Sequence, residues 1–280
     1  MKKISRRSFL AAAGLSVAAL ALTACGGSSA STASSVASSA AASSEAASTS
    51  AAAGELTTVE AGKLTMATNA AFPPYEMTTD AGEFEGIDIE TAQAIADKLG
   101  LELQIDDMDF DAALLSVQQG KADIVMAGVT VTDERKAVMD FSDSYATGIQ
   151  SIIVPEGSDI ASPDDLAGKK IGTQRGTTGY IYCSDDFGDE NVVAYDDGLT
   201  AVQALNNGQV DAVVIDNAPA QEFVAANPGL KILDTSYAEE DYAIGMAKNS
   251  PLEDAVNAAL KELKADGTLQ AIVDKYITAE

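Results

Sequence analysis

Arg135 occupies a position in the sequence where a small anion could meet it. Residues 124–126 read as a buried strand, and Ala127 and Gly128 after it leave room for close approach of the backbone. Thr132 is a favourable helix N-cap, which places Arg135 in the first helical turn. A helix N-terminus beside a planar guanidinium suits a carboxylate. A surface arginine beside a helix cap fits the same residues, so this segment alone leaves both interpretations open.

Asp216 follows a second strand, and a short internal sequence repeat makes it the counterpart of Gly128. Residues 113–123 and 201–211 share a helix, a glycine C-cap, an aspartate and then an apolar strand, at a constant offset of 88 residues. Ligands of open α/β sheets gather at the carboxyl ends of strands. We therefore expect Gly128 and Asp216 to face one cleft between two related halves. Taken alone, a carboxylate just past a strand is more often a turn residue or a helix cap.

The composition excludes several kinds of site. The 280 residues include 17 basic and 43 acidic residues and no histidine, which excludes a histidine-based triad and the usual zinc sites. The formal charge of −26 repels nucleic acid. Cys183 and Cys25 are the two cysteines, so the folded part cannot hold an internal disulfide. We expect neither a metal nor a cofactor.

The elements that must position these residues alternate along the chain. Apolar runs typical of strands lie at residues 64–68, 124–126, 170–173 and 212–215, and helical patterns lie at residues 89–99 and 252–263. This alternation predicts an α/β fold with mainly parallel strands. The roughly 220 residues after position 56 are more naturally two lobes than one.

The amino terminus reads as an export signal. Four basic residues precede an apolar run at residues 9–22 that is too short to span a bilayer, which predicts a signal peptide over residues 1–24. Cys25 ends a Leu-Thr-Ala-Cys sequence that resembles a lipobox, in which this thiol becomes lipidated. Residues 25–56 are then the lipidated cysteine and a disordered Ser/Ala tether. Arg6 and Arg7 also resemble a twin-arginine signal, so the export route stays open between that and general secretion.

Five segments resemble one known family. They read AGVTVTDER, DFSDSY, GEFEGIDIE, SPDDLAGKKIG and LKADGTLQAIVDKY. They are similar to the family 3 solute-binding proteins of polar amino-acid ABC importers, which include glutamine-, histidine- and lysine/arginine/ornithine-binding members. The resemblance covers residues 63–277. It implies a two-lobed, type II periplasmic-binding-protein-like fold, with two mainly parallel sheets joined by two crossing strands.

The resemblance also implies boundaries for the two lobes. Lobe 1 is expected from residues 57–147 and 243–280, and lobe 2 from residues 148–242. The crossings should lie near residues 146–150 and 237–244.

Site residues carried over from the family form a clamp for a free amino acid. Arg135 would bind the α-carboxylate through two parallel hydrogen bonds, and Thr178 would add hydroxyl and backbone donors to the same group. Asp216 would accept from the α-ammonium group, together with the Gly128 carbonyl and the Thr130 hydroxyl. A plain Gly-Thr helix cap would explain Thr178 equally well from the local sequence.

The residues that would select the ligand side chain come from both lobes. Phe72 and Phe110 resemble the family's two aromatic walls, although either could be core. Asn69 stands where aspartate is common in basic- and glutamine-binding members, which weakens the expectation of a strict lysine or arginine preference. Ala127 completes the expected ligand-binding set. Further possible contacts are Glu76, Asp88 and Gln174, although Asp88 could merely cap the helix after it.

The resemblance implies a noncatalytic, extracytoplasmic receptor anchored to the cell membrane through Cys25. It would capture a polar or basic L-amino acid and deliver it to a membrane permease, acting as a monomer without nucleic acid. Glutamine, histidine, arginine and lysine are the candidate ligands. Two alternatives remain at this stage: an enzyme similar to cyclohexadienyl dehydratases, which share the fold, and a chemosensory receptor.

Overall fold

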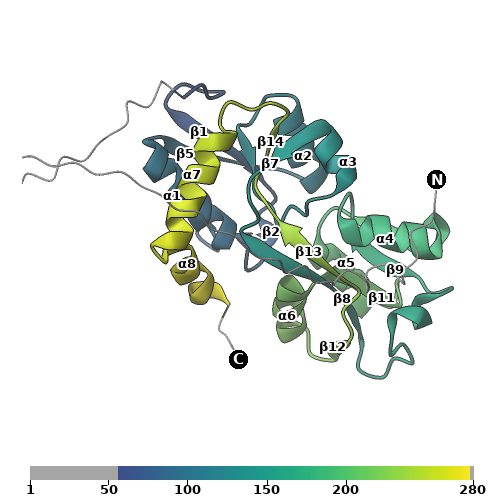
Figure 1. The fold of residues 1–280 in the computed structure, drawn as a ribbon. Helices are drawn as coiled ribbons and strands as arrows, with labels where there is room; N and C mark the ends of the chain where they lie inside the picture. The colour runs from purple at the N-terminus through teal and green to yellow at the C-terminus, as the bar shows by residue number, and fades with distance from the viewer. Residues whose placement is uncertain (1–55, 278–280) are drawn as a thin grey trace, which may run out of the picture. The chain divides into compact units, whose positions relative to one another are not determined.

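The computed structural model describes residues 56–277. The predicted signal peptide, Cys25 and the tether up to residue 55 lie outside this part. Within it, no helix combines the length and apolarity that crossing a membrane requires. The described chain is built on two large sheets, each covered by helices, and one small sheet (Figure 1).

The first large sheet has five strands in the order β5-β1-β6-β14-β7. Its strands are β1 (Lys63–Thr68), β5 (Glu102–Asp107), β6 (Ile124–Val125), β7 (Met139–Phe141) and β14 (Gly245–Ala247). The first three strands of the order are parallel, and β14 is antiparallel to both neighbours. We call this sheet and its helices lobe 1. A small antiparallel sheet precedes its first helix, with strands β2 (Ala71–Phe72), β3 (Glu76–Thr78) and β4 (Phe84–Glu85).

The second large sheet has the order β10-β9-β11-β8-β12, and β13 also pairs with β8. Its strands are β8 (Ala146–Pro155), β9 (Ile171–Gln174), β10 (Val192–Tyr195), β11 (Ala212–Asp216), β12 (Leu230–Ile232) and β13 (Ala238–Tyr242). β10, β9 and β11 are parallel, whereas β8 is antiparallel to its neighbours. We call this sheet and its helices lobe 2. The predicted α/β class, two-lobed fold and mainly parallel sheets are confirmed: one strand of each large sheet runs opposite to the others, β14 in lobe 1 and β8 in lobe 2.

Helices lie on both faces of each sheet. In lobe 1 they are α1 (Ile87–Leu99), α2 (Phe110–Gln118), α3 (Asp133–Val138), α7 (Glu253–Ala265) and α8 (Thr268–Tyr276). In lobe 2 they are α4 (Thr178–Phe187), α5 (Gly198–Asn206), α6 (Asn217–Ala226) and the short 3-10 turns η2 (Pro163–Leu166) and η3 (Asp189–Asn191). Successive residues of β11 alternate between two apolar clusters, one packed on α5 and α6 and the other on α4. Burial on both faces explains why the parallel strands read as continuous apolar runs.

Two strands of lobe 2 carry the chain between the sheets. β7 leads directly into β8, and β13 leads directly into β14. β8 and β13 run side by side and antiparallel, with Ala146 opposite Tyr242 and Gln150 opposite Ala238 (Figure 1). The two passages from one sheet to the other therefore occur together, at residues 142–145 and 243–244.

The internal sequence repeat corresponds to the same local structure in both lobes. Gly120 and Gly208 both have positive φ, at 66° and 67°, just after α2 and α5. The carboxylate of Asp123 then accepts from the Thr65 N–H at 2.8 Å, and that of Asp211 accepts from the Lys170 N–H at 2.8 Å. Each aspartate thus connects its loop to the start of a neighbouring strand of the same sheet.

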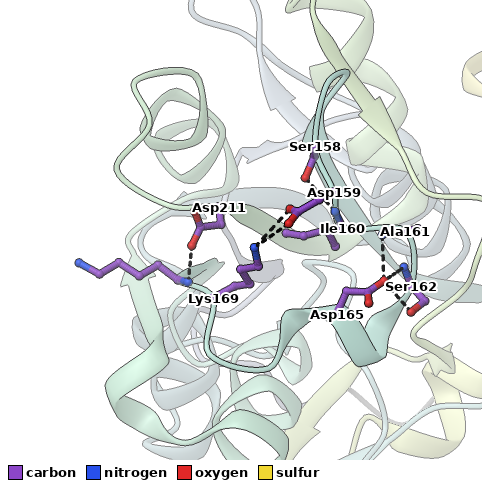
Figure 2. A network of polar contacts seen from close by, with 9 residues as sticks. Ser158, Asp159, Ile160, Ala161, Ser162, Asp165, Lys169 and Asp211 are labelled. Carbon is purple, nitrogen blue, oxygen red and sulfur yellow. Dashed lines mark hydrogen bonds and ion pairs between the residues drawn. The ribbon is translucent and has the colours of Figure 1, made fainter.

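Polar side-chain contacts hold the loop that leads from β8 to β9, which ends where Asp211 accepts from the Lys170 N–H (Figure 2). Asp165 accepts from the N–H groups of Ala161 and Ser162 and from the Ser162 hydroxyl, which forms a capping box at η2. Lys169 pairs with the exposed Asp159 at 3.2 Å. These contacts fix the entry to β9, whose far end reaches the site described next.

Candidate functional site

A pocket lies at the carboxyl ends of the parallel strands, where α/β sheets bind ligands. It encloses about 310 Å³ of space not occupied by atoms, which includes open solvent. Its lining comes from both lobes: Asn69, Phe72, Glu76, Phe110, Ala127, Gly128, Thr130 and Arg135 from lobe 1, and Gln174, Thr177, Thr178 and Asp216 from lobe 2. All ten residues predicted as ligand-binding from the sequence lie in this lining.

Arg135 is held inside the pocket by local structure. Thr132 caps α3 by accepting from the Arg135 N–H at 3.1 Å, as predicted, so the side chain starts from a fixed helical turn. Its guanidinium donates to the Thr130 carbonyl at 2.8 Å and to the Gly176 carbonyl of lobe 2 at 3.1 Å. It also lies 5.3 Å from the Phe110 ring centroid, within cation–π range. Only 8 % of the residue is exposed, and burial lowers its pKa.

Asp216 ends β11 and is the N-cap residue of α6, but its side chain caps no helix N–H. One carboxylate oxygen accepts from Gln150 Nε2 at 2.7 Å, and the other accepts from the Tyr242 hydroxyl. Burial raises the pKa of Asp216 to about 7, although the Tyr242 hydrogen bond acts in the opposite direction. Two hydrogen bonds therefore fix the orientation of the carboxylate, which has no positively charged partner among the described residues.

Glu240 of β13 lies behind the pocket and gathers donors from both lobes. Its Oε2 accepts from Thr178 Oγ1 at 2.8 Å, from Thr130 Oγ1 at 3.1 Å and from Gln150 Nε2 at 3.1 Å. The Thr178 hydroxyl was expected to donate toward the ligand, whereas in the structure it donates to Glu240. The carboxylate is the stronger acceptor available to it, and this leaves the first-turn backbone N–H groups of α4 as the donors at that end.

The two predicted aromatic walls differ in their surroundings. Phe110 begins α2 and carries the Arg135 contact described above. Phe72 stacks on Tyr75 with ring centroids 5.9 Å apart and packs against Gly128. A Cβ on Gly128 would lie 2.9 Å from a Phe72 ring carbon, and its φ of 54° is left-handed, so glycine is required there.

Asn69 and Gln174 face each other across the two lobes. Gln174 Nε2 donates to Asn69 Oδ1 at 2.9 Å and to the Asp196 carbonyl at 3.3 Å, and Asn69 Nδ2 donates to the Met108 carbonyl at 3.0 Å. Both residues are buried, and both amide groups already have protein partners. Their contact joins lobe 1 to lobe 2, as does the contact between Arg135 and Gly176.

Glu76 and Asp88 are the two further carboxylates named from the sequence, and they have different positions. Glu76 lines the pocket, is fully buried and accepts no hydrogen bond from a described donor. Burial and the adjacent Asp88 carboxylate raise the pKa of Glu76 well above its ordinary range. Asp88 does not line the pocket and does not cap α1, whose N-cap is Gly86. It accepts from the Gly128 N–H at 3.0 Å and the Tyr145 hydroxyl at 2.7 Å, so it holds the backbone that the pocket uses.

Several residues of the site gave no recognisable signal in the sequence. Thr177 lines the pocket as the N-cap of α4, whereas Gln150, Glu240 and Tyr242 surround Asp216 from the two strands between the sheets. Residues 238–242 do show strand alternation, with Glu240 and Tyr242 buried. That alternation could have placed both side chains on one face, but not beside Asp216.

Three comparisons with known proteins bear on this geometry. The sequence profile of the bacterial extracellular solute-binding proteins, family 3, matches residues 64–279. The chain is 34 % identical over 226 residues to the L-cystine-binding protein TcyJ of Escherichia coli (strain K12), covering 79 % of this chain and 85 % of that one. It is 33 % identical over 228 residues to the arginine-binding extracellular protein ArtP of Bacillus subtilis (strain 168), covering 78 % and 87 %. Among solved structures, it resembles the arginine-, lysine-, histidine-binding protein ArtJ of Geobacillus stearothermophilus, with a TM-score of 0.75, 35 % identity and coverage of 78 % and 96 %.

Proposed function

The chain belongs to family 3 of the bacterial extracellular solute-binding proteins, and we propose that it captures a basic L-amino acid, arginine first, for an ABC importer. Its relatives are amino-acid-binding proteins of transporters, so it is an extracytoplasmic binding protein and not an enzyme. The dehydratase alternative is thereby set aside.

The observation that carries the choice of ligand is the charge balance of the pocket lining. Among the lining residues, Arg135 is the one cation, whereas Glu76 and Asp216 are both acidic. A zwitterionic amino acid would pair its carboxylate with Arg135 and its ammonium group with Asp216. Glu76 would then remain buried and without a positive partner, which is costly unless the ligand side chain supplies a cation or the carboxyl stays protonated.

The α-amino and α-carboxylate ends of the ligand are assigned from the donors and acceptors that remain. Arg135 uses two of its five N–H donors on carbonyls, which leaves three for a carboxylate. Asp216 would receive the ammonium group with the Gly128 carbonyl and the Thr130 oxygen. The ligand side chain would pass between Phe72 and Phe110 toward Glu76. The remaining sides of this part of the pocket would be lined by Asn69, Gln174 and Ala127.

Arginine and citrulline provide the sharpest test, because they have nearly the same shape and differ in side-chain charge. We expect calorimetry to give at least about 100-fold tighter binding of L-arginine than of L-citrulline, since the difference is one buried charge pair worth about 3 kcal/mol. Glu76→Gln should remove most of this preference. The matched control is Glu83→Gln, an exposed glutamate in the turn that joins β3 to β4.

A wider screen defines what would contradict the proposal. A thermal-shift series over the twenty amino acids and L-cystine reports binding, because a ligand that prefers the folded state raises stability. Equal binding of arginine and citrulline would refute the side-chain assignment. Tightest binding of leucine would also refute the aromatic walls. L-Cystine as the best ligand would place this chain with its cystine-binding relative instead.

Three further parts of the proposal concern the whole chain. The lobe boundaries are proposed at 147/148 and 242/243; the passages between the two sheets, at residues 142–145 and 243–244, lie within a few residues of them. We also propose that a signal peptide is removed before Cys25, that this thiol carries a diacylglycerol anchor, and that the monomer delivers its ligand to a membrane permease. Mass spectrometry of the mature amino terminus tests the anchor: an unmodified start elsewhere in residues 26–55 would overturn it.

A further inference from the structure

Glu240 is a buried carboxylate in the site that does not line the pocket. It lies on β13 opposite Gly148 of β8, in the pair of strands that joins the two sheets. On the proposed amino-acid-binding function, we propose that Glu240 is a positioning residue for the α-ammonium end of the ligand. It would set the direction in which the hydroxyl groups of Thr130 and Thr178 donate, and it would add negative charge behind Asp216.

A threonine hydroxyl group has a single hydrogen to donate. Thr130 has one hydroxyl hydrogen, and it is directed at Glu240 Oε2 at 3.1 Å. A carboxylate oxygen can only accept, so this contact leaves the Thr130 oxygen with its lone pairs free. Toward the pocket, Thr130 can therefore act only as an acceptor, which suits an ammonium group and disfavours a carboxylate.

The same restriction applies to Thr178 and Gln150. Thr178 donates its hydroxyl hydrogen to Glu240 at 2.8 Å, and Gln150 places its two amide hydrogens on Glu240 and Asp216. Gln150 thus joins the two carboxylates and has no hydrogen left for a ligand. Near Thr130 and Gln150 the pocket therefore presents acceptors and negative charge, whereas the Thr178 hydroxyl is withdrawn from the carboxylate end and leaves the backbone N–H groups of α4 as the donors there.

The donors to Glu240 come from both lobes. Thr130 belongs to lobe 1 and Thr178 to lobe 2, so one carboxylate oxygen accepts from both lobes at once. Opening of the lobes would separate these two hydroxyl groups. The arrangement that makes Thr130 an acceptor is therefore complete only when the lobes are closed, which is when the ligand is enclosed.

The charge and the packing of Glu240 can be separated with two ligands. L-Arginine carries an α-ammonium group, and 5-guanidinopentanoic acid is the same molecule without it. The experiment measures the affinity of both for the unmodified protein, for Glu240→Gln and for Glu239→Gln. Glu239 is the matched control, because it precedes Glu240 on the same strand and is exposed.

We expect Glu240→Gln to weaken L-arginine binding by about 10- to 100-fold and to change 5-guanidinopentanoic acid binding by less than about threefold. Glu239→Gln should change neither by more than about twofold. Equal losses for the two ligands would show a structural role at the strand pair and overturn the inference, and so would no loss for either.

A second variant keeps the inference testable if Glu240→Gln does not fold. Thr130→Val keeps the side-chain shape and removes the hydroxyl group, so it should also weaken L-arginine selectively over 5-guanidinopentanoic acid. A non-selective effect would overturn the inference while leaving the proposed function in place. Failure of the unmodified protein to bind L-arginine would instead refute the proposed ligand, and the inference would be overturned with it.

Discussion

Arg135→Ala is expected to weaken binding of every amino acid that the protein accepts by about 2 to 5 kcal/mol, or about 30- to 5,000-fold in Kd. The guanidinium is 8 % exposed, and two of its N–H groups are already held by the Thr130 and Gly176 carbonyls. A ligand carboxylate would therefore meet a desolvated and pre-positioned donor. Each hydrogen bond between charged groups contributes about 1.5 to 3 kcal/mol, and the alanine variant would leave the carboxylate buried and unpaired.

Arg135→Lys separates the charge from the geometry. Lysine keeps the positive charge, but its ammonium group cannot bind the two carbonyls and both oxygens of a carboxylate in one plane. We therefore expect an intermediate loss. Lys136→Ala is the control, because Lys136 follows Arg135 in α3 and is exposed. It should change affinity by less than about twofold.

Isothermal titration calorimetry with L-arginine and one weaker amino acid ligand measures these effects, after circular dichroism has verified folding. Because Arg135 would contact a group common to all amino acids, the two ligands should lose a similar factor. A folded Arg135→Ala protein whose affinity lies within about threefold of the unmodified protein would refute the carboxylate assignment. A loss confined to one ligand would instead place Arg135 against the ligand side chain.

Contacts around the pocket and within the sheets should respond to pH and to single substitutions. Burial holds the pKa of Asp216 at about 7, so between about pH 4 and 7 the folded protein keeps a proton that the unfolded chain has released. The stability that this proton contributes is fully present below about pH 4 and is lost as the pH rises through about 7. A ligand ammonium group favours the ionised carboxylate, so calorimetry should show affinity falling below about pH 7 with proton release on binding. Both effects should be smaller in Asp216→Asn, in which the raised pKa of Glu76 remains. Gly148→Ala would bring a Cβ within 2.5 Å of the buried Tyr242 ring, so urea unfolding should show a loss of about 1 to 3 kcal/mol; an unchanged midpoint would contradict this packing. Asp123→Ala should destabilise the protein by about 1 to 3 kcal/mol and more than Asp211→Ala, since Asp123 is buried and accepts from two backbone N–H groups; equal urea midpoints would contradict this difference.

Local sequence was sufficient for the elements that carry the site. The Thr132 cap, the strand before Ala127 and the strand that ends at Asp216 depend on neighbours within a few residues, and each forms as predicted. The repeat with an offset of 88 residues then placed Gly128 and Asp216 at equivalent strand ends, and both line the pocket. Family resemblance added the other predicted lining residues, because the matching segments preserve the order of these elements along the chain, but it did not indicate Thr177.

The tertiary structure decided which polar groups are already paired. Asp88 could not be distinguished from a ligand contact or a helix cap by its sequence position, and its actual donors, the Gly128 N–H and the Tyr145 hydroxyl, lie 40 and 57 residues away. The hydroxyl of Thr178 was expected to donate toward the ligand, but Glu240, 62 residues away, accepts its hydrogen.

Sequence patterns determine which face of an element a side chain occupies, because that face depends on a repeat of two or 3.6 residues. Whether a buried carboxylate keeps free lone pairs depends on donors that other elements bring to it, and those distances exist only after the sheets have packed. The amino-acid-binding class came from the resemblance of five sequence segments to a known family, and not from these periodic patterns. Only the folded chain shows that the Glu76 carboxylate accepts no hydrogen bond from the described residues, and that Glu240 accepts hydrogen bonds from Thr130 and Thr178.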